Sequence, residues 1–205
     1  MSSKEALLIV ISAPSGGGKT TLCDRLLAKH SEISRAVTCT TRKPRADEQD
    51  GLHYHFLSAD AFLKKVAAGD FLEYANVYDN LYGTLRSEVV KKLSNGKHVL
   101  LNIDVQGAES IRKVAQLDSQ LRPCLVTVFL TPGSLDELKR RLEKRGTESE
   151  HVLAKRLSQA SEELSHWNKF DYLIASTSAD EDLRRMEVIL EAELMRQTRV
   201  QPPTF

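Results

Sequence analysis

The stretch LLIVISAPSGGGKT, residues 7–20, joins a continuous apolar run to a glycine-rich loop that ends in a lysine and a threonine. An uninterrupted run of Leu, Ile and Val predicts a strand buried on both faces of a parallel sheet. A helix is expected to follow, over residues 19–30. A strand, a glycine loop and a helix in this order predict a phosphate site, because glycines let backbone N–H groups converge on an anion at the positive end of the helix.

The loop follows the pattern G-x-x-x-x-G-K-[ST] except at its first position, where Ala13 replaces glycine, a residue that tolerates positive φ better than alanine. In this pattern Lys19 is expected to reach the β- and γ-phosphates of a nucleoside triphosphate, and the Thr20 hydroxyl to bind Mg²⁺. The alternative is a glycine turn with a chance lysine, and the flanking strand and helix favour phosphate binding over it. The residues expected to bind the nucleotide are Ala13, Pro14, Ser15, Gly16, Gly17, Gly18, Lys19, Thr20 and Thr21.

Three further apolar runs, at 97–104, 123–131 and 170–176, are also typical of buried strands. They alternate with helical patterns, of which residues 106–117 are one example. This alternation predicts an α/β fold with a doubly wound parallel sheet.

Two segments depart from plain alternation. Residues 35–87 are polar and rich in turns, with a short helix expected near 60–68, and residues 134–165 form a charged helical hairpin. Capping boxes at Ser134 and Thr147 mark the two helix starts of this hairpin, and a third at Ser178 marks the start of the last helix. We expect both segments to be insertions at the edge of the sheet.

The composition limits the classes of partner. The chain has 205 residues, 41% of them hydrophobic, which is enough for one sizeable core. Its 29 Lys and Arg balance 28 Asp and Glu, so neither a nucleic-acid surface nor a membrane partner is indicated. No apolar stretch is long enough to span a membrane, and no targeting segment is evident, so a cytoplasmic location is expected. An odd number of widely spaced cysteines favours unpaired thiols over disulfides or a zinc site: Cys23, Cys39 and Cys124.

Two arginines in the turn-rich segment are candidates for binding a second anion. Arg42 and Arg45 are separated by three positions, with Pro44 stiffening the chain between them and Tyr54 downstream. Two guanidinium groups held close together can clamp a dianionic phosphate. The alternative, which is the more common one for such a pair, is a solvated basic turn.

Glu73 lies among apolar and aromatic residues, where a carboxylate is costly unless it is paired. A carboxylate can accept two parallel hydrogen bonds from N1–H and the 2-amino group of guanine, a donor pair that adenine lacks. Tyr82 can bind a phosphate, and the Thr84 hydroxyl can address the base carbonyl. The alternative is that Glu73 pairs with a nearby lysine or arginine.

Asp104 ends the apolar run at 97–104, at the edge where α/β proteins bind ligands. It is expected to bind Mg²⁺ through water or to contact the molecule that accepts the phosphoryl group, and it can also cap the next helix.

Mobile arginines can neutralise charge during phosphoryl transfer. The charged hairpin supplies three candidates, for which a solvated helix face is the alternative: Arg141, Arg145 and Arg156.

Taken together, these segments resemble the guanylate kinase family. The resemblance covers nearly the whole chain and is carried, in order, by APSGGGKT, TTRKPR, DGLHYHF, FLEYANVYDNLYGT, NIDVQG and RLEKRGTES followed by AKRL. It implies a P-loop kinase fold with a core at 1–36, 89–133 and 166–205, a GMP-binding domain at 37–88 and a lid at 134–165. It also implies Mg²⁺-dependent transfer of the ATP γ-phosphoryl group to GMP or dGMP.

The resemblance further implies a role for each matching residue. Lys19 and the loop would hold ATP, and Mg²⁺ would be held by Thr20 and, through water, by Asp104. The GMP-binding residues would be Thr38, Arg42, Arg45, Tyr54, Glu73, Tyr82, Thr84 and Asp104, of which Glu73 and Thr84 would recognise guanine. The residues acting in the transfer itself would be Lys19, Arg42, Arg141, Arg145 and Arg156.

The sequence departs from the family pattern at three places. Thr38 and Asn102 stand where members often have serine and aspartate, and Ser176-Thr177-Ser178 stands where Asn-Asp is usual near the adenine. Two other interpretations remain open. One is a guanylate-kinase-like module that binds phosphopeptides without catalysis, which the intact Lys19 and Thr20 disfavour. The other is a kinase for a phosphorylated sugar, in which Glu73 would have no purpose. The sequence leaves homo-oligomer formation open.

Overall fold

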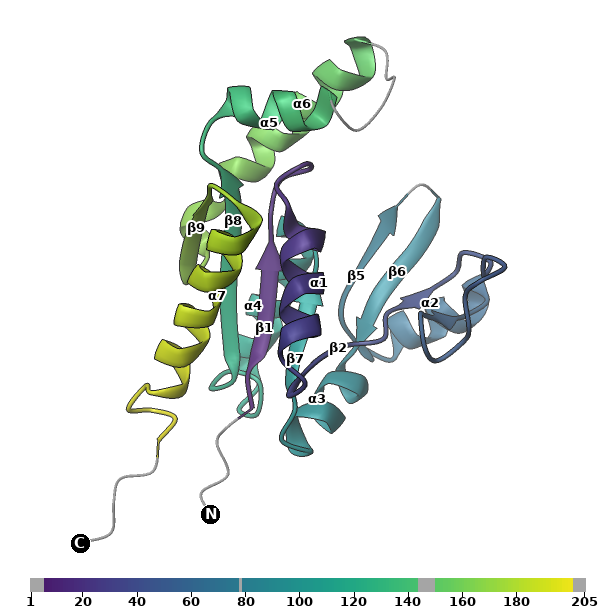
Figure 1. Ribbon diagram of the computed structural model, residues 1–205. Coiled ribbons are helices and arrows are strands. Elements are labelled where there is room, and N and C mark those ends of the chain that lie inside the picture. Colours follow the sequence, from purple (N-terminus) through teal and green to yellow (C-terminus); the bar gives the residue numbers. More distant parts are fainter. Residues whose placement is uncertain (1–5, 78, 144–149, 201–205) are drawn as a thin grey trace, which may run out of the picture.

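The computed structural model describes residues 6–77, 79–143 and 150–200. Its centre is a sheet of five parallel strands (Figure 1). In spatial order these are β2 (Ile33–Arg35), β7 (His98–Asn102), β1 (Leu8–Ser12), β8 (Leu125–Pro132) and β9 (Tyr172–Ser176). The predicted doubly wound parallel sheet is confirmed. The sequence analysis missed β2, whose three residues are too few to show a pattern.

Helices cover both faces of this sheet (Figure 1). Alternate side chains of β1 point to opposite faces, so Ile9 packs with one pair of helices and Val10 with the other. The pair on the Ile9 side is α1 (Lys19–Lys29) and α7 (Ala179–Leu194), and the pair on the Val10 side is α3 (Arg86–Ser94) and α4 (Val105–Leu117). All five residues of β1 are buried, which explains why its sequence is continuously apolar.

A second, smaller sheet stands beside the core (Figure 1). Its four strands are, in spatial order, β4 (His55–Phe56), β3 (Cys39–Thr40), β6 (Asn80–Leu85) and β5 (Phe71–Val77). The pairs β3–β6 and β5–β6 are antiparallel, while β3–β4 is parallel. Helix α2 (Ala59–Ala67) packs on this sheet through Phe62, whose ring stacks on Phe71 with centroids 4.5 Å apart.

The charged hairpin extends from the carboxyl end of β8, at the top of Figure 1. It consists of α5 (Leu135–Glu143) and α6 (Glu150–Leu164), which meet through the buried Leu138 and Ala160. The predicted caps form: the Ser134 hydroxyl accepts from Glu137 N at 3.1 Å, and the Ser178 hydroxyl accepts from Glu181 N at 3.2 Å. Thr147 lies outside the described residues. A 3₁₀ turn (Trp167–Lys169) leads from the hairpin to β9.

Cys23 and Cys39 are free thiols, and both are buried. Burial raises the pKa of the Cys23 thiol to about 12, so it stays protonated and unreactive at neutral pH. Within the described ranges, no helix is long and apolar enough to cross a membrane.

Ile9 is fully buried at the centre of the sheet, whereas Leu117, the last residue of α4, is 93% exposed. We expect Ile9→Ala to lower the free energy of unfolding by about 2–5 kcal/mol, because it removes buried methyl groups and leaves a cavity. Leu117→Ala is the control and should change it by less than about 0.5 kcal/mol. Urea unfolding followed by circular dichroism measures both, and equal effects would contradict the assigned core.

Candidate active site

The loop after β1 is shaped by its glycines. Gly16 and Gly18 have φ of 82° and 94°, a region that disfavours residues with a Cβ. At Gly17 a Cβ would lie only 2.9 Å from both Ala13 Cβ and Pro14 O. Ala13 itself is buried and has no positive φ, so alanine is accommodated at the first position of the pattern. The loop therefore needs glycine where its backbone turns and packs on itself, at positions 16–18.

Lys19 bridges this loop to the next strand. Its Nζ donates to the carbonyl of Ile103 at 2.8 Å, just beyond the end of β7. Burial lowers the pKa of the Lys19 ammonium, and the nearby Asp104 opposes that shift. The ammonium thus lies between the loop and the carboxyl end of β7, where an incoming phosphate would find a poorly solvated cation.

The carboxylate of Glu163 contacts the glycine loop. Ser15 N donates to Glu163 Oε2, in the last turn of α6, at 3.0 Å. Burial raises the pKa of Glu163, while the bond from Ser15 and the charge of Lys19 stabilise its ionised form. An anion is therefore already favoured at this end of the loop. The sequence analysis missed Glu163 because the contact joins residues 148 positions apart.

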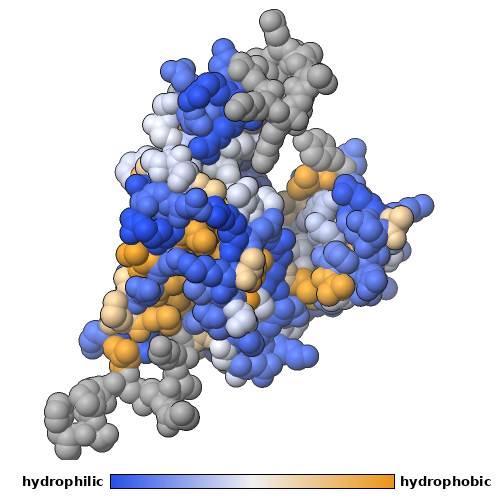
Figure 2. All heavy atoms as spheres, viewed as in Figure 1, coloured by the Kyte–Doolittle hydropathy of each residue, from blue (hydrophilic) through white to orange (hydrophobic). Residues whose placement is uncertain are grey.

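On one side of Lys19 lies a cavity of about 290 Å³ between the core and the second sheet. Figure 2 shows the molecule open between the hairpin and the second sheet. The cavity brings together six residues that the sequence analysis had selected from five separate segments: Lys19, Thr38, Tyr54, Glu73, Tyr82 and Asp104. Asn102 and Ile103 also line it.

Glu73 is buried in this cavity, with 8% of the residue exposed. The Thr84 hydroxyl donates to its Oε1 at 2.7 Å across the β5–β6 pair. Burial raises the pKa of the Glu73 carboxyl, an effect that the bond from Thr84 counteracts and the charge of Asp104 increases. No lysine or arginine forms an ion pair with Glu73 among the described residues, so the alternative of a basic partner is not supported.

A register shift in β5 between Phe71 and Glu73 explains how this carboxylate turns inward. Leu72 and Glu73 are both buried, although neighbouring side chains on a regular strand face opposite sides. On the partner strand, a Cβ at Gly83 would lie 2.9 Å from the Phe71 ring, so only glycine fits there. Gly107 of α4 is similarly close, since a Cβ there would lie 3.3 Å from Glu73 Oε2 and from Asp104 Oδ1.

Arg42 lies at the outer rim of this group. Its guanidinium donates to Glu48 Oε1 at 2.7 Å and lies 5.5 Å from the centroid of the Tyr54 ring. The Tyr54 and Tyr82 rings meet edge to face with centroids 6.1 Å apart. The Arg42 guanidinium lowers the pKa of Glu48 to about 2, so the pair stays ionised at neutral pH. Glu48, missed from the sequence, therefore holds Arg42 beside the tyrosines.

Arg45 is arranged differently from Arg42. Its backbone N–H donates to Glu48 Oε2 at 2.8 Å, but its side chain is exposed and does not line the cavity.

A second cavity, of about 320 Å³, lies on the other side of the loop. The loop and α1 contribute Gly16, Gly18 and Thr21, and α5 contributes Arg141. Ser176, whose position the sequence analysis related to the adenine, and Asp182, which it did not assign to a site, complete its wall from β9 and α7. Arg145 lies outside the described residues, and Arg156 belongs to α6 but its side chain is not described. Of the three candidate arginines, the described structure therefore places Arg141 at the site.

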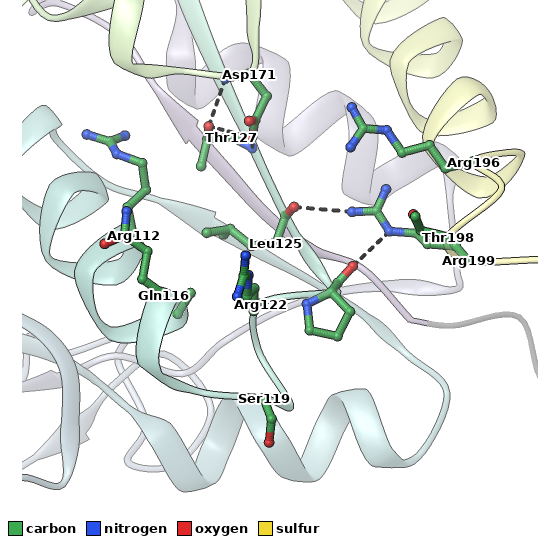
Figure 3. Close-up of a pocket in the computed structure, with 12 residues that line it drawn as sticks. Arg112, Gln116, Ser119, Arg122, Leu125, Thr127, Asp171, Arg196, Thr198 and Arg199 are labelled. Carbon is green, nitrogen blue, oxygen red and sulfur yellow. Dashed lines mark hydrogen bonds between the residues drawn. The ribbon is translucent and has the colours of Figure 1, made fainter.

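A larger cavity, of about 810 Å³, lies at the opposite end of β8 (Figure 3). Arg199 there donates to the carbonyls of Pro123 and Leu125, at 2.9 and 3.3 Å, and Asp171 accepts from Thr127 at 2.7 Å. These bonds fasten the segment after α7 and the start of β9 to β8. Ligands of α/β folds bind at the carboxyl ends of strands, so this cavity is set apart from the candidate site.

Comparisons with known proteins identify the family of this chain. The guanylate kinase family model matches residues 5–193. The chain belongs to the guanylate kinase family. A guanylate kinase from Hydrogenovibrio crunogenus is 48% identical over 185 residues, covering 90% of this chain and 87% of that protein. One from Paramagnetospirillum magneticum is 41% identical over 204 residues, covering 99% and 92%.

The fold of this guanylate kinase family member also matches a solved structure. The crystal structure of guanylate kinase from Anaplasma phagocytophilum superposes with a TM-score of 0.72 at 31% identity, covering 96% of this chain and 90% of that one. The resemblance inferred from the sequence motifs is thereby confirmed for the family and for the fold.

Proposed function

We propose that this member of the guanylate kinase family transfers the γ-phosphoryl group of ATP to GMP or dGMP with the help of Mg²⁺. The observation that carries the proposal is the buried pair of Glu73 and Thr84, 2.7 Å apart, in the same cavity as Lys19. A base-recognising carboxylate and a phosphate-binding lysine facing one space are what transfer between two nucleotides requires.

The donor would be held by the loop at 13–18, with Thr20 and Thr21 at the start of α1. Its phosphates would take the place of Glu163 at Ser15 N, because both are anions and the loop amide can serve only one acceptor at a time. Its adenosine would lie toward the cavity lined by Thr21 and Ser176.

The acceptor would lie in the cavity between the core and the second sheet. Glu73 would accept from N1–H and the 2-amino group of guanine. To contact the base carbonyl, the Thr84 hydroxyl would turn its single donor from Glu73 to that oxygen. Tyr54, Tyr82 and the guanidinium of Arg42 already lie together, and they would bind the phosphate of GMP. Thr38 lines the same cavity, and Arg45 would have to turn inward to join this group.

The residues around Lys19 fit a magnesium ion. Thr20 provides an exposed hydroxyl at the first turn of α1. Asp104 Oδ1 caps α4 by accepting from Gly107 N at 2.8 Å, while its Oδ2 has no hydrogen-bond partner in the part of the chain that the structure describes. Hard oxygen ligands of this kind suit Mg²⁺, which keeps several waters and binds nucleotide phosphates. Bound there, the ion would neutralise charge on the transferred group.

The transfer itself needs little covalent help from the protein. An anionic oxygen of the GMP phosphate forms a bond to the γ-phosphorus while the bond to the β-phosphate oxygen breaks, which yields GDP and ADP. No general base is needed, because the attacking oxygen already carries charge. Lys19 and the hairpin arginines Arg141, Arg145 and Arg156 would neutralise the oxygens of the moving group.

We assign the core to 1–36, 89–133 and 166–205, the GMP-binding domain to 37–88 and the lid to 134–165. The boundaries are supported by the second sheet, which lies within 37–88, and by α5 and α6, which lie within 134–165. A cytoplasmic location follows from the proposed substrates, which are intracellular nucleotides, and fits the free thiols of Cys23 and Cys39.

The function is tested directly with a panel of acceptors. With ATP and Mg²⁺, we expect GMP to be phosphorylated at least about 100-fold more efficiently than AMP, CMP or UMP, because the other bases lack the guanine donor pair. A coupled assay of ADP release measures each rate. Equal use of GMP and AMP, or GMP binding without any ADP release, would contradict the proposal, and the second result would favour a binding module.

Lys19→Met should lower kcat for GMP phosphorylation by at least about 100-fold, because it removes the cation that the γ-phosphoryl group would meet. GMP affinity, measured by calorimetry, should be unchanged. The matched control is Lys29→Met at the other end of α1, where the side chain pairs with Glu187 on the surface. A variant at position 19 that keeps the wild-type rate would remove Lys19 from the mechanism.

Glu73→Gln should lower kcat/KM for GMP by roughly 100-fold, since an amide cannot accept both hydrogen bonds and leaves a base donor unpaired. Thermal unfolding should change much less than turnover. Glu191→Gln, at an exposed position of α7, is the control and should leave kinetics unchanged. If Glu73→Gln preserves the preference for GMP over AMP, this carboxylate does not select guanine.

A further inference from the structure

A chain of contacts connects the hairpin to the core beside the second cavity. Both terminal nitrogens of Arg141, on α5, donate to the Ser176 hydroxyl oxygen at 3.4 Å. The Ser176 hydroxyl in turn donates to Asp182 Oδ2, on α7, at 2.7 Å. The other oxygen of Asp182 accepts from the backbone N–H of Thr177 at 3.3 Å. Helix α5, which is distant in sequence, therefore meets β9 and α7 at one hydroxyl group.

The chemistry of a hydroxyl fixes the direction of these bonds. Ser176 has a single proton and two lone pairs, so it can donate to one partner only. A carboxylate oxygen accepts hydrogen bonds, and Asp182 Oδ2 accepts the one from Ser176. The lone pairs of Ser176 are then available to Arg141, whose guanidinium can only donate. The carboxylate of Asp182 thus determines which way the hydroxyl presents itself to the arginine.

Both members of the pair are shielded from water. Ser176 and Asp182 are each 5% exposed, so the bond between them is not weakened by competing solvent. A buried carboxylate is costly unless its partners are in place. The geometry of the pair is therefore fixed by the core, and Arg141 meets a rigid acceptor.

Arg141 has one further anchor, on its own helix. Its Nε donates to Glu137 Oε1 at 2.8 Å, one turn earlier in α5. The guanidinium is thus held at Nε by the hairpin and at its two terminal nitrogens by the core. This places it over the loop, where a Cβ built on Gly18 would lie 3.7 Å from Arg141 Nη1.

We propose that Asp182 and Ser176 are positioning residues that hold Arg141 beside the phosphate-binding loop. The inference rests on the proposed function, in which Arg141 neutralises charge on the transferred phosphoryl group. Asp182 does not touch substrate in this scheme. It acts through Ser176, by fixing the hydroxyl that receives the guanidinium.

The first test compares two acids of α7. In Asp182→Asn, the new amide N–H group can donate a hydrogen bond to the Ser176 oxygen, which reverses the direction of the bond. The Ser176 hydroxyl hydrogen would then point toward Arg141. We expect kcat for GMP phosphorylation to fall by roughly 10- to 100-fold, with KM for ATP and GMP within about twofold of wild type, because the change misplaces a charge needed in the transition state. Asp180→Asn is the control, since its side chain is 88% exposed and pairs with Arg25. That variant should retain the wild-type kcat.

The second test separates positioning from a merely structural role. In an Arg141→Ala background, Asp182→Asn should cause no further loss of kcat, because the group that it positions is already gone. A purely structural defect would lower kcat by the same factor in both backgrounds. Ser176→Ala should reproduce the loss of kcat, and Ser176→Thr, which keeps the hydroxyl, should restore most of it. These serine variants also test the proposal if Asp182→Asn does not fold.

Three results would overturn the inference: wild-type kcat in Asp182→Asn and Ser176→Ala, equal losses in both backgrounds, or no recovery with threonine. They are distinguishable from failure of the proposed function. A wild-type chain that consumes no GMP contradicts the function itself, whereas an active wild type with unaffected variants contradicts only the positioning role.

Discussion

The turn between β1 and α1 is the constraint on which the rest of the structure depends. Gly17 packs so closely on Ala13 and Pro14 that no side chain fits, and Gly16 and Gly18 adopt a backbone region that few other residues accept. The strand before this turn lies between β7 and β8, so the turn emerges at the middle of the carboxyl edge of the sheet. Cavities lie on its two sides, with Lys19 at one of them, and in the proposed function they would hold two different nucleotides.

Each group that would bind phosphate already has an internal partner. Lys19 rests on a carbonyl, Ser15 N on the Glu163 carboxylate, Arg42 on Glu48, and Arg141 on a serine hydroxyl. Poorly solvated donors without acceptors would destabilise the unliganded fold. Exchanging an internal acceptor for a phosphate oxygen costs less than stripping water from a free ion. Two of these contacts, Ser15 with Glu163 and Arg141 with Ser176, join the hairpin to the core. Nucleotide binding at these donors would therefore be coupled to the position of the hairpin.

A small irregularity in β5 places the Glu73 carboxylate where it would recognise guanine in the proposed function. The register shift in β5 turns this carboxylate toward the cavity, Gly83 permits the approach, and Thr84 supplies one hydrogen bond while leaving the other oxygen free of this contact. Burial makes the charge costly, as the raised pKa of Glu73 records, so a ligand with two donors would relieve that cost. In the proposed function, the strength of base recognition would thus have its source in a carboxylate that the fold leaves destabilised.

The sequence by itself determined the parallel sheet, the glycine loop and most helix starts, because buried strands are continuously apolar and caps such as Ser178 are local signals. Its motifs also contain or adjoin six residues that line one cavity between the core and the second sheet, while their role in binding remains a proposal. Only the tertiary structure decided which residues meet across long separations: Glu163 with Ser15, and Arg141 with Ser176. It also set the pairing of β3, β4 and β6, whose short segments carry no readable period. Those contacts depend on how the elements pack in space, which leaves no local pattern in the chain.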